Sequence, residues 1–235
     1  MKIDMLLCWP RDIFYPYFVD LINKNRHLFN KVIVVMTQKA DNRDYIYDIK
    51  KYIKDATVLI NYPYKGLDWR QDAIIEGLYE TRGSHVLFFE QDFLVMDGFF
   101  EQLFERGKYF QVAGFRDGER FHPACLLVTQ EAIASTEKDF SVQKDVGDHF
   151  YKFTKQLEKL NNWASLGFLN LPDYYHMAGL TQNYRLTDNF YCPHEFFTYN
   201  DLCLNLPMPD SWRKFLQTKH ISEYIPDEKI KKFFI

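Results

Sequence analysis

The sequence predicts a single-domain α/β protein built on a mostly parallel sheet, and three observations support this prediction. The chain has 235 residues, which suits one large domain, and no segment inside it resembles a linker. Hydrophobic residues make up 47% of the chain and aromatic residues 18%, which is enough to form a core. Short apolar runs alternate with helical patterns up to residue 90, as expected when crossover helices join the strands of a layered sheet.

The first 90 residues contain four apolar runs that read as strands. These runs are Ile3–Trp9, Val32–Met36, Thr57–Asn61 and His85–Phe89. Helical spacing is expected between them, around residues 17–28, 45–53 and 73–81, and Arg82-Gly83-Ser84 is expected to end the third helix with a capping glycine. Each crossover is long enough for parallel pairing, and ligands bind such sheets beyond the carboxyl ends of the strands.

The rest of the chain has a different pattern, which predicts that the sheet is mixed. A helix is expected near residues 98–105, and two strands, 110–115 and 124–129, flank the polar turn RDGERFHP. Another helix is expected at residues 150–160, and an amphipathic stretch begins at about residue 227.

Charge and cysteine content exclude several classes of protein. The 29 basic and 32 acidic residues give a net charge of −3, which offers no general attraction to nucleic acid. The four cysteines are far apart and have no metal-binding spacing, so they read as buried thiols in a reducing cytoplasm. No stretch is long enough to span a membrane. The basic and apolar tail KIKKFFI leaves peripheral membrane contact open, although an ordinary terminal helix is favoured.

The sharpest local feature is the triplet Glu90-Gln91-Asp92, in which an apolar strand ends in two carboxylates. Carboxylates in this position suit a hard divalent cation such as Mg²⁺ or Mn²⁺, which offsets the charge of a diphosphate leaving group. The alternative is a solvated turn after the strand, and the triplet alone does not decide between the two.

In its order of motifs, the chain resembles the GT-A class of nucleotide-diphospho-sugar glycosyltransferases, particularly the family 2-like members. Those proteins have a helix of the form R-x-x-A-x-x-x-G-L, matched here by Arg70, Ala73, Gly77 and Leu78. An apolar strand ending in a D-x-D motif follows, matched by VLFFEQD. The resemblance covers roughly residues 3–180. It implies a Rossmann-related three-layer sandwich with a nucleotide-binding half, about 1–95, and an acceptor half, about 96–235, in one domain.

The resemblance assigns a donor and metal site to the end of the fourth strand. Asp92 matches the last D-x-D position, which ligates the metal, and His176 resembles the late histidine that completes the metal shell. Glu90 stands where the family has an aspartate facing the nucleotide, and Gln91 lies between the two acids. For His176 the alternative is a hydrogen-bonded structural histidine.

Three residues outside the triplet are expected to flank the nucleotide. Asp68 and Arg70 lie at the start of the R-x-x-A helix, and Thr37 lies where the second strand ends. Plain surface polarity is an equally good explanation for all three.

The resemblance also implies a catalytic carboxylate after the D-x-D motif. Asp148 is the nearest match, and in an inverting reaction it takes the proton from the attacking acceptor hydroxyl. Asp145 is the second candidate. The rival explanation for Asp148 is that it is the N-cap of the following helix, which stabilises the helix by about 1 kcal/mol.

We therefore expect a glycosyltransferase that moves a sugar from a nucleotide-diphosphate donor, a UDP-sugar above all, to a glycan or other hydroxyl acceptor. Two alternatives stay open. A nucleotidyltransferase is disfavoured because the loop CWPRDIF lacks glycines, and a catalytically silent sugar-nucleotide binder is supported by Glu90 in place of aspartate. His122 and His194 lie in aromatic loops that suit an acceptor pocket, although packing is the better explanation for each.

Overall fold

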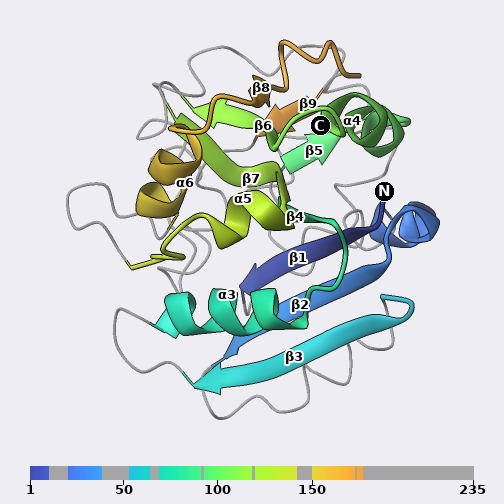
Figure 1. Ribbon diagram of the computed structural model, residues 1–235. Helices are drawn as coiled ribbons and strands as arrows, with labels where there is room; N and C mark the ends of the chain where they lie inside the picture. The colour runs from blue at the N-terminus through green and yellow to red at the C-terminus, as the bar shows by residue number, and fades with distance from the viewer. Residues whose placement is uncertain are drawn as a thin grey trace, which may run out of the picture.

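A single mixed sheet organises the protein. The computed structural model describes residues 1–10, 21–38, 53–63, 69–90, 93–117, 120–141, 150–172 and 174–176. Within them, seven strands lie in the order β3-β2-β1-β4-β7-β6-β8 (Figure 1). Their bounds are β1 Ile3–Pro10, β2 Lys31–Gln38, β3 Ala56–Pro63, β4 His85–Phe89, β6 Val112–Asp117, β7 Arg120–Thr129 and β8 Trp163–Ser165.

The first four strands are parallel, as the sequence predicts. β1 pairs with β2 and β4, and β2 pairs with β3, all in parallel register. β4 has the predicted bounds, whereas β1, β2 and β3 extend one to two residues beyond the apolar runs at one or both ends. The carboxyl ends of all four strands therefore lie at one edge of the sheet, which we call the ligand edge.

The second half adds antiparallel pairing. β7 is antiparallel to β4 and to β6, and β6 is parallel to β8. The predicted hairpin is confirmed, but β7 begins at Arg120 rather than at residue 124. Asp117 pairs with Arg120, so the strands continue through most of the polar segment that sequence reasoning assigned to the turn.

Helices cover both faces of the sheet and complete three layers. The helices are α3 Trp69–Glu80, α4 Phe99–Gly107, α5 Gln130–Ala134 and α6 Tyr151–Leu157, with a short 3₁₀ turn η1 at Arg26–Leu28 and helical residues 21–24. Strand residues alternate between two cores: Met5 and Leu7 enter one, and Leu6 enters the other. α4 packs in the first core and α3, α5 and α6 in the second; α3 and α5 lie on the near face of the sheet in Figure 1.

A buried carboxylate fastens the amino ends of three parallel strands. Asp4 of β1 is fully buried. Its Oδ1 accepts a hydrogen bond from Asn30 Nδ2 at 2.7 Å, and Oδ2 accepts from the backbone N–H groups of Arg82 at 2.5 Å and Gly83 at 2.6 Å. Asn30 precedes β2, and the other two donors precede β4. Three donors compensate for the cost of burying this charge.

Gly83 has a different role from the predicted one. It does not have the positive φ of a capping glycine; among the described glycines only Gly98 does. A Cβ atom on Gly83 would instead lie 2.6 Å from the backbone oxygen of Lys2. The glycine is therefore required by the close approach of the loop before β4 to the start of β1.

Gly77 explains why the motif of α3 needs a glycine. A Cβ atom there would lie 2.5 Å from Leu6 Cδ1 and 2.9 Å from Val35 Cγ2. These side chains belong to β1 and β2, so the glycine lets the helix approach the sheet directly above the two strands that lead toward the ligand edge.

Replacing Gly77 by valine is expected to lower the free energy of unfolding by about 1–3 kcal/mol, because the added methyl groups overpack a filled core. Urea denaturation followed by circular dichroism measures this loss. Gly167→Val is the matched control, since nothing lies within 4 Å of a Cβ at Gly167. Equal stability of the two variants would contradict the close packing of α3.

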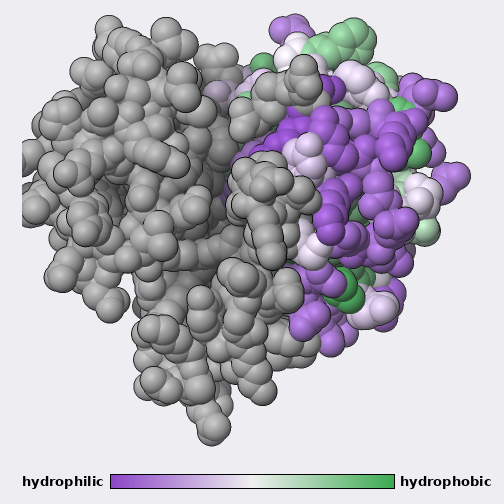
Figure 2. Space-filling model, turned by 90° about the vertical axis from the view of Figure 1, so that its left-hand side faces the viewer, coloured by the Kyte–Doolittle hydropathy of each residue, from purple (hydrophilic) through white to green (hydrophobic). Residues whose placement is uncertain are grey.

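The described surface is largely hydrophilic in the view of Figure 2. No helix among the described residues combines the length and the apolar character needed to cross a bilayer. The predicted helix at residues 45–53 lies outside the described residues except for residue 53. The amphipathic stretch from residue 227 lies wholly outside them.

Candidate functional site

The carboxyl end of β4 is held by backbone hydrogen bonds on both sides of Glu90. The N–H group of Glu90 donates to the carbonyl of Ala124 in β7 at 3.0 Å. Its carbonyl accepts from the N–H of Phe93 at 3.2 Å, which holds the start of β5, Phe93–Val95, close to the end of β4. Gln91 and Asp92 connect these two points and lie outside the described residues. The side chain of Glu90 is half-buried.

A second, two-stranded sheet holds the segment that contains His176 close to the end of β4. β5 pairs antiparallel with β9, Tyr174–His176, and Phe93 is the register partner of His176. The backbone of His176 is therefore adjacent to the residue that follows Asp92. Only the backbone of His176 is described.

Aromatic packing attaches this small sheet to the large one. Phe93 is fully buried; its ring stacks on that of Tyr174 at a centroid distance of 5.4 Å and meets Phe115 of β6 edge-on, also at 5.4 Å. Burial raises the pKa of the Tyr174 hydroxyl, and nearby Cys125 raises it further. The Tyr174 phenol is therefore neutral at physiological pH and acts as a packing group beneath the end of β4.

Two of the three positions expected to flank the nucleotide, Thr37 and Arg70, lie on described elements. Thr37 is the penultimate residue of β2, opposite Pro10 of β1. Arg70 is the second residue of α3, the helix that follows β3. The side chains of Thr37 and Arg70 are not described, and Asp68 lies outside the described residues.

The two candidate bases, Asp145 and Asp148, also lie outside the described residues. The described chain resumes at Phe150, which occupies the N-cap position of α6 and makes no side-chain capping bond. Neither the role of Asp148 as a base nor its role as a helix cap is tested by the described part of the chain.

The two expected metal ligands, Asp92 and His176, are of residue types that bind divalent cations, and the side chain of neither is described. Among the described residues there is no group of three or more His, Cys, Asp and Glu side chains able to hold a metal ion. Carboxylate and imidazole ligands suit Mn²⁺. The β5–β9 register places the backbone of His176 opposite Phe93, the residue that follows Asp92 in the chain.

Sequence reasoning missed the two strands that build the site. β5 and β9 have three residues each, too few for a periodic pattern to show. The available signal was composition, because FLV and YYH are both rich in residues that favour strands.

Comparison with solved structures finds similar proteins of low sequence identity. S. aureus TarS matches with a TM-score of 0.50 and 12% identity, over 89% of this chain and 40% of that chain. Glucosyl-3-phosphoglycerate synthase from Mycobacterium tuberculosis, in complex with phosphoglyceric acid, has a TM-score of 0.48 and 14% identity over 74% of this chain and 71% of that chain.

Mannosyltransferase PcManGT from Pyrobaculum calidifontis, in complex with GDP-Man and Mn²⁺, has a TM-score of 0.49 and 13% identity over 70% of this chain and 54% of that chain. No protein-family model matches the sequence, and no curated protein matches it. At these identities the likeness is one of fold.

Proposed function

We propose, from the GT-A-like fold that the likeness to TarS confirms, that this chain is a glycosyltransferase that uses a nucleotide-diphosphate sugar. The observation that carries the proposal is the register of β5 and β9. It brings the His176 segment beside the residue that follows Asp92, at the end of a parallel strand. Fold alone does not determine function, so this convergence of two motif positions is the stronger support.

Asp92 and His176 are the proposed ligands of Mn²⁺ or Mg²⁺. Such a cation offsets the negative charge that develops on a diphosphate leaving group. Glu90 and Gln91, which come directly before Asp92 in the chain, contact the donor in this proposal, with Glu90 toward the ribose or base. Thr37, Asp68 and Arg70 are the proposed residues on the nucleotide side. Thr37 is in β2, which ends at the ligand edge, Arg70 is near the start of α3, and Asp68 comes just before that helix in the sequence. A UDP-sugar is the proposed donor.

Asp148 is the proposed general base, with Asp145 as the second candidate. An ionised carboxylate takes the proton of the acceptor hydroxyl as its oxygen attacks the anomeric carbon from the side opposite the diphosphate. The product then has inverted configuration. α6 is described from Phe150 onward, and both candidate bases precede it in the chain.

One domain and a cytoplasmic location belong to the same proposal. We propose one domain of residues 1–235. The large sheet continues across residue 95, because β4 pairs with β7, and this joins the nucleotide half to the described part of the acceptor half. The buried free thiol of Cys125 suits a reducing compartment. Fractionation of cells that produce the protein would test the location.

Calorimetric titration with UDP-, GDP- and CDP-sugars, with and without Mn²⁺, tests the function. We expect one nucleotide to bind in a Mn²⁺-dependent manner, and product analysis to show sugar transfer to a hydroxyl acceptor. If no sugar nucleotide binds, the proposal is wrong. Binding without turnover would select the silent binder, the alternative that Glu90 favours.

A further inference from the structure

A short turned segment follows β8 and leads toward β9. Residues 166–170 form this turn, and within it the N–H of Asn170 donates a hydrogen bond to the carbonyl of Gly167 at 3.3 Å. The backbone of Asn170 has a φ of 49°, in the left-handed region. Leu169 is buried in the first core, on the side of the sheet where α4 packs. As at the end of a helix, the last carbonyls of such a turn need acceptor partners from outside it.

Arg106 of α4 supplies the donors for the last two carbonyls of this turn. Its guanidinium group donates from Nη1 to the carbonyl of Leu169 at 2.6 Å and also to the carbonyl of Asn170. Hydrogen bonds from a charged donor are roughly twice as strong as neutral ones. Arg106 is half-buried, and none of the carboxylates in the described ranges forms an ion pair with it. Its charge therefore acts on the backbone of the turn.

The anchored turn leads directly into β9. Three residues separate Asn170 from Tyr174, the first residue of β9, so this connection spans about 14 Å at most. Leu171, within the connection, packs against the first core. The ring of Tyr174 meets that of Phe99 in α4 edge-on at a centroid distance of 5.9 Å, and α4 lies beside β5 and β9 in Figure 1. α4 therefore holds the segment before β9 and the first residue of β9.

The pairing of β5 with β9 needs such contacts, because each strand has only three residues. Two short strands alone are marginally stable in water. Successive side chains of a strand alternate between its faces, so a slip of one residue would move His176 to the opposite face of the small sheet. The short connection from Asn170 would have to absorb that shift, or the contacts with Arg106 would break.

We infer that Arg106 is a positioning residue for the proposed cation site. By holding the carbonyls of Leu169 and Asn170, it fixes the register at which β9 pairs with β5, and thereby the face on which His176 is presented. Its effect passes through the backbone, so it requires no contact with the metal or the donor. This inference rests on the proposed function and adds the group that keeps the second metal ligand in place.

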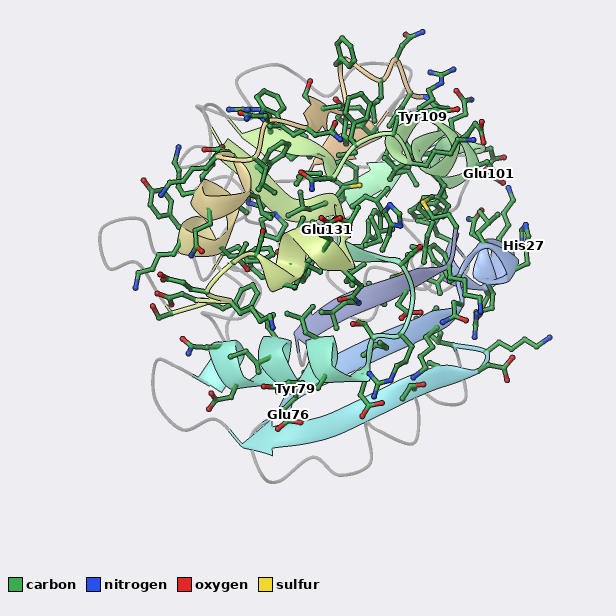
Figure 3. All side chains as sticks on the ribbon, viewed as in Figure 1. His27, Glu76, Tyr79, Glu101, Tyr109 and Glu131 are labelled. Carbon is green, nitrogen blue, oxygen red and sulfur yellow. The ribbon has the colours of Figure 1, made fainter. Side chains whose placement is uncertain are left out.

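Substitutions in α4 and just after it separate this role from a general effect of charge. Arg106→Leu keeps an apolar side chain and removes both donors, whereas Arg106→Lys keeps a charged donor for one carbonyl. Lys108→Leu is the matched control, because it removes a positive charge two residues further on. Lys108 pairs with Glu105 at 2.6 Å and lies over the ring of Tyr109, which is exposed at the end of α4 in Figure 3.

Hydrogen exchange of the metal-free protein, measured by mass spectrometry on peptides that cover residues 171–176, reports the pairing of β9. We expect exchange to be roughly tenfold faster in Arg106→Leu, the effect of losing a charge-assisted hydrogen bond, and to recover in part in Arg106→Lys. Lys108→Leu should exchange like the unaltered chain. Thermal unfolding shows whether each variant folds, and the shorter, uncharged Arg106→Gln replaces Arg106→Leu if that variant does not.

Binding of Mn²⁺ in the presence of UDP gives the second measurement. The electron paramagnetic resonance signal of free Mn²⁺ yields the affinity, with UDP alone as the reference. We expect the affinity to fall roughly tenfold in Arg106→Leu and to recover in part in Arg106→Lys. Nitrogen hyperfine coupling of the bound Mn²⁺, the signature of an imidazole ligand, should be present in the unaltered chain and weaken in Arg106→Leu.

The outcomes distinguish failure of this inference from failure of the proposed function. If the unaltered chain binds no Mn²⁺ beyond the UDP reference, the proposed cation site is overturned and the role of Arg106 with it. Unchanged exchange at residues 171–176 in folded Arg106→Leu overturns the inference alone, as does faster exchange with unchanged Mn²⁺ affinity. An equal loss of Mn²⁺ affinity in Lys108→Leu also overturns it, because loss of charge would then be the cause.

Discussion

Replacing Asp92 by asparagine is expected to lower the rate of sugar transfer at least about 100-fold, the size of effect seen when one group that stabilises developing charge is removed. Asparagine keeps the shape of the side chain and removes the negative charge that attracts a divalent cation. Mn²⁺-dependent binding of UDP, measured by calorimetry, should weaken in parallel. Steady-state rates with saturating donor give the second measurement.

Asp97→Asn is the control for this substitution. Asp97 lies just after β5, and its carboxylate is exposed and pairs with Lys24 at 2.7 Å. An exposed ion pair contributes about 0–1 kcal/mol, so its loss should leave both folding and transfer nearly unchanged. Full activity in Asp92→Asn would show that the Asp92 carboxylate is not needed to bind the metal. The main chemical reason for placing the active site at the end of β4 would then be lost.

Replacing Asp4 by alanine is expected to lower the free energy of unfolding by about 3–5 kcal/mol. The substitution leaves the buried N–H group of Gly83, the partly buried N–H group of Arg82 and the Asn30 amide without their acceptor, and it opens a small cavity under β1. A loss of this size is a large part of the 5–15 kcal/mol that stabilises a typical domain. Urea denaturation monitored by tryptophan fluorescence and by circular dichroism measures it.

Asp4→Asn tests how much of the loss in Asp4→Ala comes from removing hydrogen-bond acceptors. It retains one acceptor oxygen, so we expect a smaller loss of about 1–2 kcal/mol. Asp97→Ala controls for loss of an exposed carboxylate. If Asp4→Ala unfolds at the same urea concentration as the unaltered chain, the three hydrogen bonds do not fasten the amino ends of the strands.

The parallel half of the fold was predictable because three of its strands, β1, β2 and β4, have buried apolar residues on both faces. A strand such as His85–Phe89 reads as a continuous apolar run between polar residues, and its bounds were predicted correctly. The hairpin was predicted with less accuracy. Arg120 and Asp117 are register partners across it, so the ladder continues into polar residues that a hydrophobic pattern does not mark as strand.

Only the part of the candidate site that is contiguous in sequence could be predicted. The acidic triplet follows a strand, so its place at the ligand edge could be inferred from the apolar run before it. The pairing of Phe93 with His176 could not be inferred, since three-residue strands depend on tertiary contacts such as the Phe93–Tyr174 stack. The role of Gly83 was missed for a similar reason: the proximity of Lys2 is not visible in the sequence.

The β5–β9 pairing has a consequence for the order in which the protein matures on the ribosome. β1, β2, β3 and β4 are all synthesised before residue 90, whereas the partner of Phe93 is residue 176. A nascent chain can therefore assemble its parallel strands early, yet it lacks the second segment of the proposed cation site until nearly three quarters of the polypeptide has emerged. Divalent-ion affinity should then appear late in biosynthesis, and chains arrested shortly after β7 should be compact but unable to retain Mn²⁺.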